Sequence, residues 1–310
     1  MKVYSGDPAT WTSPAAGSAV AIGVFDGVHR GHRAVFDALA SGDEGLQLTA
    51  MTFSTHPDGV VSGSPAPPAL TTLERRLELF DEAGLDATAI IDFDVDVMRL
   101  SPEAFVDRFL VDSLNAKTVA VGDGFRFGYE AVGTVDTLRL LGQSRGFSLV
   151  STPILTIHGT QVRSSSIRAA VASGGVALAA RMLGRPFAVD GVVVSGDGRG
   201  STIGVPTANV EVPDGFVRPA GGVYAVVATV DGIDYNGVCN VGVRPTFGGG
   251  AETIEVHILG HDLQLTGKTV HVAFVERIRS EQRFDSVNEL VSQIAVDIER
   301  AEQVFATQEG

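Results

Sequence analysis

The stretch AVAIGVFDGVHRGHRAVFDALA, residues 19–40, decides the fold of the first half of the chain. Its apolar start is typical of a buried strand, and its end, residues 33–40, has the pattern of a helix. An Asp-Gly pair between the two predicts a tight turn. His29 and His32 then lie at the N-terminus of the helix, where backbone N–H groups and the helix dipole favour an anion.

The alternation of strand and helix continues far beyond this stretch. Further strands are expected at residues 46–53, 87–94 and 117–125, and helices at 70–84 and 101–114. Repeated strand–helix–strand units predict an α/β fold with a doubly wound parallel sheet. The two histidines would then lie at the carboxyl end of a central strand, where open α/β sheets bind their ligands.

The pattern changes after residue 184. Short β-branched runs are separated by glycine turns, and Asp231-Gly232 predicts a hairpin. Such regular strands without helices predict a small antiparallel β-barrel. A capping box at Ser286 and Glu289 begins one terminal helix. Its apolar stripe is expected to pack on the barrel and consists of Val287, Leu290, Val291, Ile294 and Ile298. We therefore expect two domains, residues 1–184 and 185–310.

Composition limits the partners of the protein. The 310 residues include 37 Asp and Glu against 23 Lys and Arg, a formal net charge of −14. So acidic a chain is a poor candidate for binding nucleic acid or an anionic membrane. The start of the chain lacks the apolar core of a signal peptide, and no apolar run approaches the roughly 18 residues that span a bilayer. We expect a cytoplasmic protein with small-molecule partners; a weak homo-oligomer stays open.

The histidine pair has three interpretations. Zinc needs three or four ligands, and two histidines at this spacing give weak support, although His56 and His158 could converge on them. Packing in a core is the second. Phosphate binding is favoured, because an imidazole can donate to a phosphate and stabilise charge that develops during transfer. Gly31 would let a ligand approach the backbone closely.

A second anion cradle is predicted by RSSSIR, residues 163–168. Ser164 and Ser165 come just before a helix, and their hydroxyls could join helix N–H groups and Arg168 around an anion. The alternative is simple capping of the helix.

The barrel half carries a cluster of its own in GDGRGSTIGVPTANV, residues 196–210. Its glycines expose backbone N–H groups that could hold phosphate, or they form an ordinary hairpin loop. Thr207 and Asn209 offer neutral oxygens that suit Mg²⁺ shared with a nucleotide, or they bond within a turn.

Glu255 lies in TIEVHIL, a strand on which Thr253, Glu255 and His257 share one face. Facing inward, Glu255 would be a buried carboxylate with a raised pKa and a good general base. Facing outward, it would be an ordinary solvated glutamate. The spacing leaves both open.

Taken together, the motifs resemble the bacterial bifunctional riboflavin kinase/FAD synthetase family, in that family's order and over nearly the whole chain. The N-terminal motifs are GVFDGVHRGH, TFSTHP, LSPEAFV, VGDGFRFG and SSSIR. The C-terminal motifs are VPTANV, GGVYAVV, NVGVRPTFGGG, TIEVHIL and RSEQRFDS. The resemblance implies that a nucleotidyltransferase domain transfers AMP from ATP to FMN. It also implies that the barrel phosphorylates riboflavin with ATP and Mg²⁺.

The resemblance also implies roles for residues of the α/β domain. His29 and His32 would bind the ATP phosphates and steady the transition state at the α-phosphorus, while Ser164, Ser165 and Arg168 would hold the β- and γ-phosphates. The remaining ATP contacts are expected at Gly23, Phe25, Asp26 and Gly31.

In the barrel, Glu255 would take the proton from the 5′-hydroxyl of riboflavin. Thr207 and Asn209 would hold Mg²⁺ and ATP. The expected phosphate loop is Gly198, Arg199 and Gly200, and the expected flavin contacts are Arg279, Glu281 and Phe284, with the last helix closing over the flavin.

Some positions depart from the family pattern. Gly124 stands where the family has Asp or Asn, Arg163 where it has Ser, and Ser165 where it has Thr. Gly124 favours one alternative, a kinase with a decayed adenylyl domain. A flavin-binding regulator with little turnover is another, which the intact Glu255 and the Pro-Thr-Ala-Asn motif disfavour.

Overall fold

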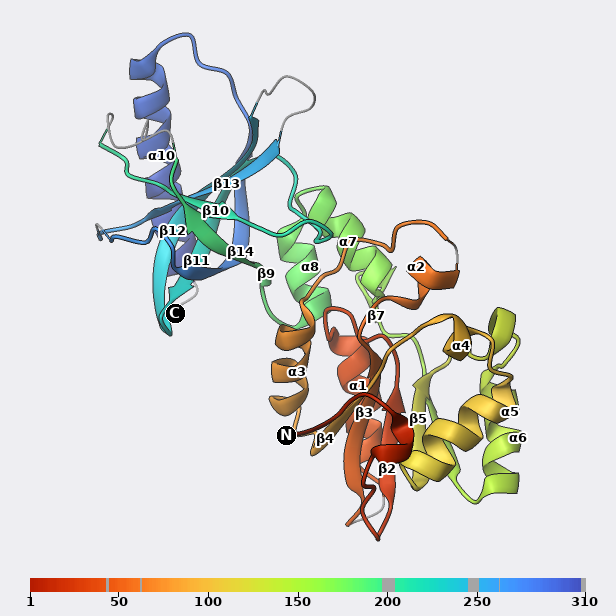
Figure 1. The fold of residues 1–310 in the computed structure, drawn as a ribbon. Coiled ribbons are helices and arrows are strands. Elements are labelled where there is room, and N and C mark those ends of the chain that lie inside the picture. The colour runs from red at the N-terminus through yellow and green to blue at the C-terminus, as the bar shows by residue number, and fades with distance from the viewer. Residues whose placement is uncertain (43–44, 62, 197–203, 245–250, 262, 308–310) are drawn as a thin grey trace. The chain divides into compact units, whose positions relative to one another are not determined.

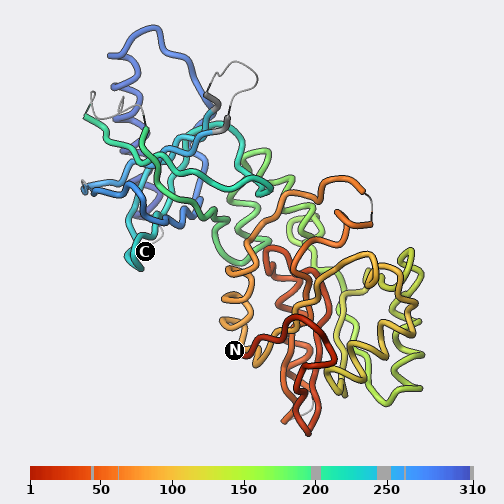
Figure 2. The backbone as a smooth tube through the Cα atoms, viewed as in Figure 1, coloured from red at the N-terminus to blue at the C-terminus, as the bar shows by residue number. Residues whose placement is uncertain are grey.

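The computed structural model describes residues 1–42, 45–61, 63–196, 204–244, 251–261 and 263–307 (Figures 1 and 2). Its contacts divide the chain into two compact units, Met1–Ser164 and Ser165–Gly310. The sequence predicts a division at 184/185 instead. The difference concerns α7 (Ser164–Ala172) and α8 (Val176–Leu183), and α8 packs on strands of the barrel.

The first unit is built on a six-stranded parallel sheet in the order β1-β4-β3-β2-β5-β6 (Figure 1). This confirms the predicted doubly wound α/β fold. The strands are β1 (Lys2–Tyr4), β2 (Ser18–Ile22), β3 (Gln47–Phe53), β4 (Ala87–Ile91), β5 (Ala116–Gly122) and β6 (Ser148–Thr152).

Helices cover both faces of this sheet, and its central strand is therefore buried on both sides. Val20 and Ile22 of β2 belong to one apolar cluster, and Ala19 and Ala21 to another on the opposite face. A strand buried in this way is a continuous apolar run. The helices are α1 (Arg30–Ala40), α2 (Pro57–Val61), α3 (Leu73–Asp81), α4 (Val95–Met98), α5 (Pro102–Phe105) with the π-helical segment Val106–Ser113, and α6 (Val135–Arg145).

The order of the strands places a switch point beside β2. From β2 the chain continues through β3 and β4 on one side, and β5 and β6 lie on the other. Open α/β sheets bind ligands at such a point, beyond the carboxyl ends of the strands. The loop that follows β2 and carries the two histidines therefore lies where a ligand is expected.

The second unit contains a closed antiparallel barrel in the order β10-β13-β12-β11-β14-β9, as predicted (Figure 1). Asp231 and Gly232, with φ of 50° and 78°, form the expected hairpin turn, because both have the left-handed backbone that such turns require. The strands are β9 (Phe187–Val194), β10 (Ala208–Glu211), β11 (Gly222–Val230), β12 (Ile233–Arg244), β13 (Ala251–Ile258) and β14 (Thr269–Ser280).

The terminal helix α10 (Val287–Ala306) packs on the barrel by its second half only. Ala301, Val304 and Phe305 are buried against apolar side chains of the strands. The predicted stripe is wrong for Val287 and Val291, which are 62% and 37% exposed, whereas its other three members are half-buried: Leu290, Ile294 and Ile298. Periodicity identifies an apolar face of a helix but not how far its partner extends.

A buried ion pair fixes α10 to β14. The guanidinium of Arg279 donates from Nε and Nη2 to both carboxylate oxygens of Asp297, at 2.8–3.0 Å. Gln293 also donates to this carboxylate, at 2.9 Å. The side chains of Arg279 and Asp297 are only 17% and 3% exposed, so water has little access to the pair and could not compensate if one of the two charges were removed.

No helix in the described part of the chain is long and apolar enough to cross a membrane.

Breaking the buried pair should loosen the helix. We expect Asp297→Ala to lower the free energy of unfolding of the barrel by about 3 kcal/mol, because it leaves a buried guanidinium without its carboxylate. Glu276→Ala is the matched control, since Glu276 pairs with Arg300 of the same helix across an exposed 3.9 Å contact and should cost under about 1 kcal/mol. Urea denaturation compares the two; equal losses would contradict the assignment.

Candidate functional site

The loop after β2 places His29 at the N-cap of α1. His29 Nδ1 accepts a hydrogen bond from the backbone N–H of His32 at 3.2 Å, and the ring is 5% exposed. Because Nδ1 accepts, the proton of the neutral ring is on Nε2. The capping role is therefore compatible with a second role as a donor through Nε2.

The two histidine rings stack. Their centroids lie 3.5 Å apart with 19° between the planes, and His32 meets Phe25 edge-on. A metal ion lies in the plane of each imidazole that binds it, so two rings stacked face to face at 3.5 Å do not direct their nitrogens at one common ion. Gly31 lies close against this ring pair, since a Cβ atom at this position would be 3.1 Å from Cε1 of His29 and would push that ring aside by a few tenths of an ångström.

His32 is held in the neutral form. Desolvation is the largest cause that lowers the pKa of His32 well below its ordinary 6.5, followed by the charges of His29 and Arg76. A neutral imidazole is a hydrogen-bond donor or acceptor rather than a fixed cation near neutral pH.

The histidines open onto a cavity of about 270 Å³ at the carboxyl ends of β2, β5 and β6. Six of the predicted ATP contacts line it: Gly23, Phe25, His29, Gly31, His32 and Ser164. Gly124 and Arg163, two departures from the family pattern, line it as well. Ser165 and Arg168 lie further along α7, in the second unit.

Asp26 has a different position from the one we expected for an ATP contact. Its buried carboxylate accepts hydrogen bonds from the backbone N–H groups of Leu70 and Thr71 at 2.9–3.1 Å. Its carbonyl oxygen accepts the hydroxyl of Ser164 at 2.9 Å. Asp26 is not among the described residues that line the cavity, and its bonds join two segments, at residues 70–71 and at Ser164, to the histidine loop.

Some lining residues were not predicted. Gly122 ends β5, and Thr152 ends β6. The strand pattern could have identified them, because the carboxyl ends of neighbouring parallel strands meet at one edge of the sheet.

In the barrel, Glu255 faces away from the core. Ile254 and Val256 are buried, whereas Thr253, Glu255 and His257 are half-buried on the opposite face. The register pairs Glu255 with Asn209 on one side and with Asn240 on the other. Directly opposed residues of antiparallel strands share a face, so an amide flanks the carboxylate on each side.

Thr207 lines a second cavity, of about 480 Å³, at the start of β10. His257 Nδ1 lies 2.8 Å from the carbonyl oxygen of Pro206 and so ties the Pro-Thr-Ala-Asn segment to β13. A Cβ atom at Gly196 would overlap the side-chain amide of Asn209, which would have to move. The predicted phosphate loop, Gly198 to Gly200, lies outside the described residues.

The three predicted flavin contacts gather at the end of β14. Arg279 stacks its guanidinium over the ring of Phe284 at 5.7 Å, in addition to its bonds to Asp297. Glu281 reaches across to β12, where a Cβ atom at Gly242 would lie 2.9 Å from Oε1 of Glu281. The guanidinium of Arg279 is thus already engaged in holding α10.

Two family models match the chain. The model described as FAD synthetase matches residues 12–166, and the model described as riboflavin kinase matches residues 183–305. Each match contains one of the two cavities.

Curated relatives match over almost their whole length. A protein of Escherichia coli named bifunctional riboflavin kinase/FMN adenylyltransferase is 39% identical, with 98% of each chain covered. A Bacillus subtilis protein of the same name is 36% identical, with 94% of this chain and 93% of that one covered.

A solved structure described as a macrolide-efflux protein from Streptococcus pneumoniae has the same fold. It is 28% identical with a TM-score of 0.88, covering 97% of this chain and 99% of that chain. Its description differs from the names of the curated relatives and is said of that protein alone.

The lowered pKa of His32 links stability to pH. The unfolded chain takes up a proton near pH 6.5, whereas folded His32 resists it, so this contribution is complete above 6.5 and falls as pH drops below it. We expect His32→Gln to remove up to about 1.4 kcal/mol per pH unit of that fall. Urea unfolding of both proteins between about pH 7.5 and pH 5 measures it; parallel curves would refute the assignment.

Gly124 leaves room for a side chain. Its backbone is not left-handed, and a Cβ atom there would meet none of the described atoms within 4 Å. We expect Gly124→Asn to change the free energy of unfolding by less than about 1 kcal/mol. At Gly133 a Cβ atom would lie 2.7 Å from the carbonyl oxygen of Phe127, so Gly133→Asn should cost about 1–3 kcal/mol in the same urea experiment.

Proposed function

The chain belongs to the bifunctional riboflavin kinase/FMN adenylyltransferase family, and from this premise we propose how its residues divide the two reactions. The enzyme phosphorylates riboflavin to FMN with one ATP and adenylylates FMN to FAD with another. One observation supports this division: each compact unit has a cavity of its own, the first lined by six of the predicted ATP contacts and the second by Thr207. We place the functional boundary at 184/185, just inside the riboflavin kinase match, which begins at residue 183.

Adenylyl transfer belongs to the cavity of the first unit. A phosphate oxygen of FMN forms a bond to the α-phosphorus of ATP while the bond to the β-phosphate oxygen breaks and pyrophosphate leaves. His29, with its proton on Nε2, and neutral His32 donate to the phosphates as charge develops. The hydroxyl of Ser164 keeps the loop closed on α7 through Asp26, while Ser165 and Arg168 hold the outer phosphates.

Phosphoryl transfer belongs to the barrel. The 5′-oxygen of riboflavin forms a bond to the γ-phosphorus of ATP, its proton goes to Glu255, and ADP leaves. Asn209 and Asn240 flank this carboxylate and orient it. The nucleotide lies in the cavity beside Thr207, and Glu281 and Phe284 line the flavin site, where Arg279 holds α10 in place.

The donor set of the barrel fits Mg²⁺. Asn209 is paired with Glu255 in the register, and Thr207 lies two residues before it, so two neutral side-chain oxygens of the kind that suit Mg²⁺ come from one short segment. When bound, the ion neutralises the charge on the ATP phosphates. The cytoplasmic location, the weak homo-oligomer and the absence of nucleic-acid and membrane partners stay predictions from the sequence.

Substitutions in each site should separate the two activities. We expect Glu255→Gln to lower FMN formation by about 10²- to 10⁴-fold, because the general base is lost, and to leave the conversion of FMN to FAD unchanged. His32→Gln is the reciprocal variant and should impair only FAD formation. Product analysis with riboflavin and, separately, with FMN measures both. Loss of both activities in a folded Glu255→Gln protein would contradict two separate sites, and a native chain that makes no FAD from FMN would leave a kinase alone.

A further inference from the structure

Arg76 of α3 is a buried cation beneath the histidine loop. Only 7% of the residue is exposed. Its Nη1 donates to the carbonyl oxygens of Val24 at 2.8 Å and Phe53 at 3.2 Å, and to the hydroxyl of Thr52 at 3.1 Å. These three acceptors come from two different strands or the residues that follow them, so one guanidinium fixes where both strands end.

The acceptors lead directly into the site. Val24 follows β2 and comes five residues before His29, and Thr52 donates its own hydroxyl to the same Val24 carbonyl at 2.9 Å. Arg76 itself is not among the described residues that line the cavity. Any influence that it has on a ligand there must act through the loop and the histidines.

The loop needs such support because its backbone is strained. Phe25 and Val28 have φ of 53° and 39°, in a region where side chains other than glycine are disfavoured, and Val28 is also β-branched. Such a backbone conformation is energetically costly and persists only when the surrounding structure enforces it. Two sets of hydrogen bonds hold the strained backbone in place here. Arg76 donates to Val24 on one side, and Leu70 and Thr71 donate to Asp26 on the other.

The guanidinium also contributes a charge to the site. Its positive charge is one cause of the lowered pKa of His32, after desolvation and the charge of His29. The charges nearest Arg76 are Asp26 and Glu74, which favour the charged form of the guanidinium, while burial lowers the pKa of Arg76. Without Arg76, its positive charge would no longer oppose protonation of His32.

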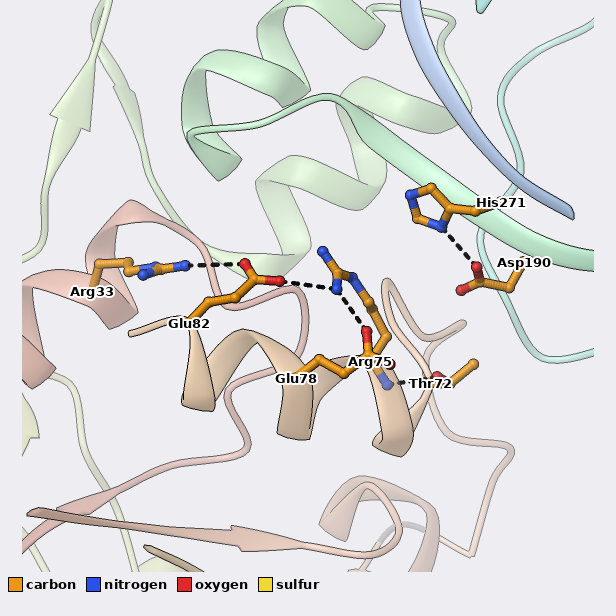
Figure 3. A network of polar contacts seen from close by, with 7 residues as sticks. All are labelled: Arg33, Thr72, Arg75, Glu78, Glu82, Asp190 and His271. Atoms are coloured by element: carbon orange, nitrogen blue, oxygen red, sulfur yellow. Dashed lines mark hydrogen bonds and ion pairs between the residues drawn. The ribbon is translucent and has the colours of Figure 1, made fainter. Parts of the chain in front are cut away.

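We propose that Arg76 is a positioning residue of adenylyl transfer: it holds the strained turn that presents His29 and His32 and supplies the buried positive charge behind them. This inference rests on the proposed function of the first unit. The next residue along α3 provides a natural control. Arg75 forms ion pairs with Glu78 at 2.6 Å and Glu82 at 3.0 Å, and Glu82 also pairs with Arg33 of α1 at 4.0 Å (Figure 3). Unlike Arg76, Arg75 is held by side-chain carboxylates on its own helix.

The test compares Arg76→Gln with Arg75→Gln in the full-length enzyme. Gln at 76 keeps an N–H donor but removes the charge. We expect kcat for FAD formation from FMN to fall about 10- to 100-fold with KM for ATP changed less than about 3-fold, because the catalytic groups rather than the binding surface are displaced. The pH below which kcat for FAD formation falls should move up towards 6.5, because His32 is then protonated more easily. Arg76→Lys, which keeps the positive charge, should return this pH to the native value. Arg75→Gln should match the native enzyme in every measurement.

Riboflavin phosphorylation by the same samples is the internal control and should stay unchanged. A folded Arg76→Gln enzyme with native kcat and a native pH dependence would overturn the proposal. Should that variant fail to fold, Thr52→Val removes only the hydroxyl between Arg76 and Val24, and we expect a loss of about 3- to 10-fold in kcat for FAD formation; native kcat would overturn the proposal equally. A native enzyme that forms no FAD would instead refute the proposed function itself.

Discussion

The hydrogen bonds that the buried carboxylate of Asp26 accepts from Leu70 and Thr71 hold the first site together. They connect the turn after β2 to the segment that begins α3, and the carbonyl of the same residue receives the hydroxyl of Ser164. A carboxylate that accepts several N–H bonds is held firmly in one place. The left-handed backbone of the turn, the N-cap at His29 and the stacking of the two rings all depend on this anchor.

In the barrel, the candidate catalytic groups lie on the outer face of the sheet. Closure leaves no free strand edge among its six strands, so the interior can be wholly apolar and the chemistry can lie on the outer face. Glu255 illustrates this, because its neighbours Ile254 and Val256 fill the core while the carboxylate faces outward between two amides. Of the two positions considered for Glu255, the outward one is observed, and its role as a base then depends on what binds over that face.

Much of this arrangement can be predicted from short-range patterns. A strand buried on both faces is a continuous apolar run, so β2 and the helix after it are evident in residues 19–40. The Asp-Gly turn at residue 231 likewise identifies a hairpin, because few other pairs adopt its backbone. Prediction is less successful where a residue finds its partner far along the chain. Asp26 is expected near ATP, yet it binds backbone 44 and 45 residues away, and the stripe on α10 is only half covered.

The sequence by itself determined the two domain types, the helix N-terminus that carries His29 and His32, and the family, because each depends on neighbouring residues and on motif order. Only the tertiary structure decided which side chains stand around those motifs. Arg76 is an ordinary position on an amphipathic helix until folding brings it beneath Val24 and Phe53. Arg279 is likewise a flavin contact by motif, but folding gives its guanidinium to Asp297. The physical reason is the same for both, since a buried charge takes the partner that packing brings within reach.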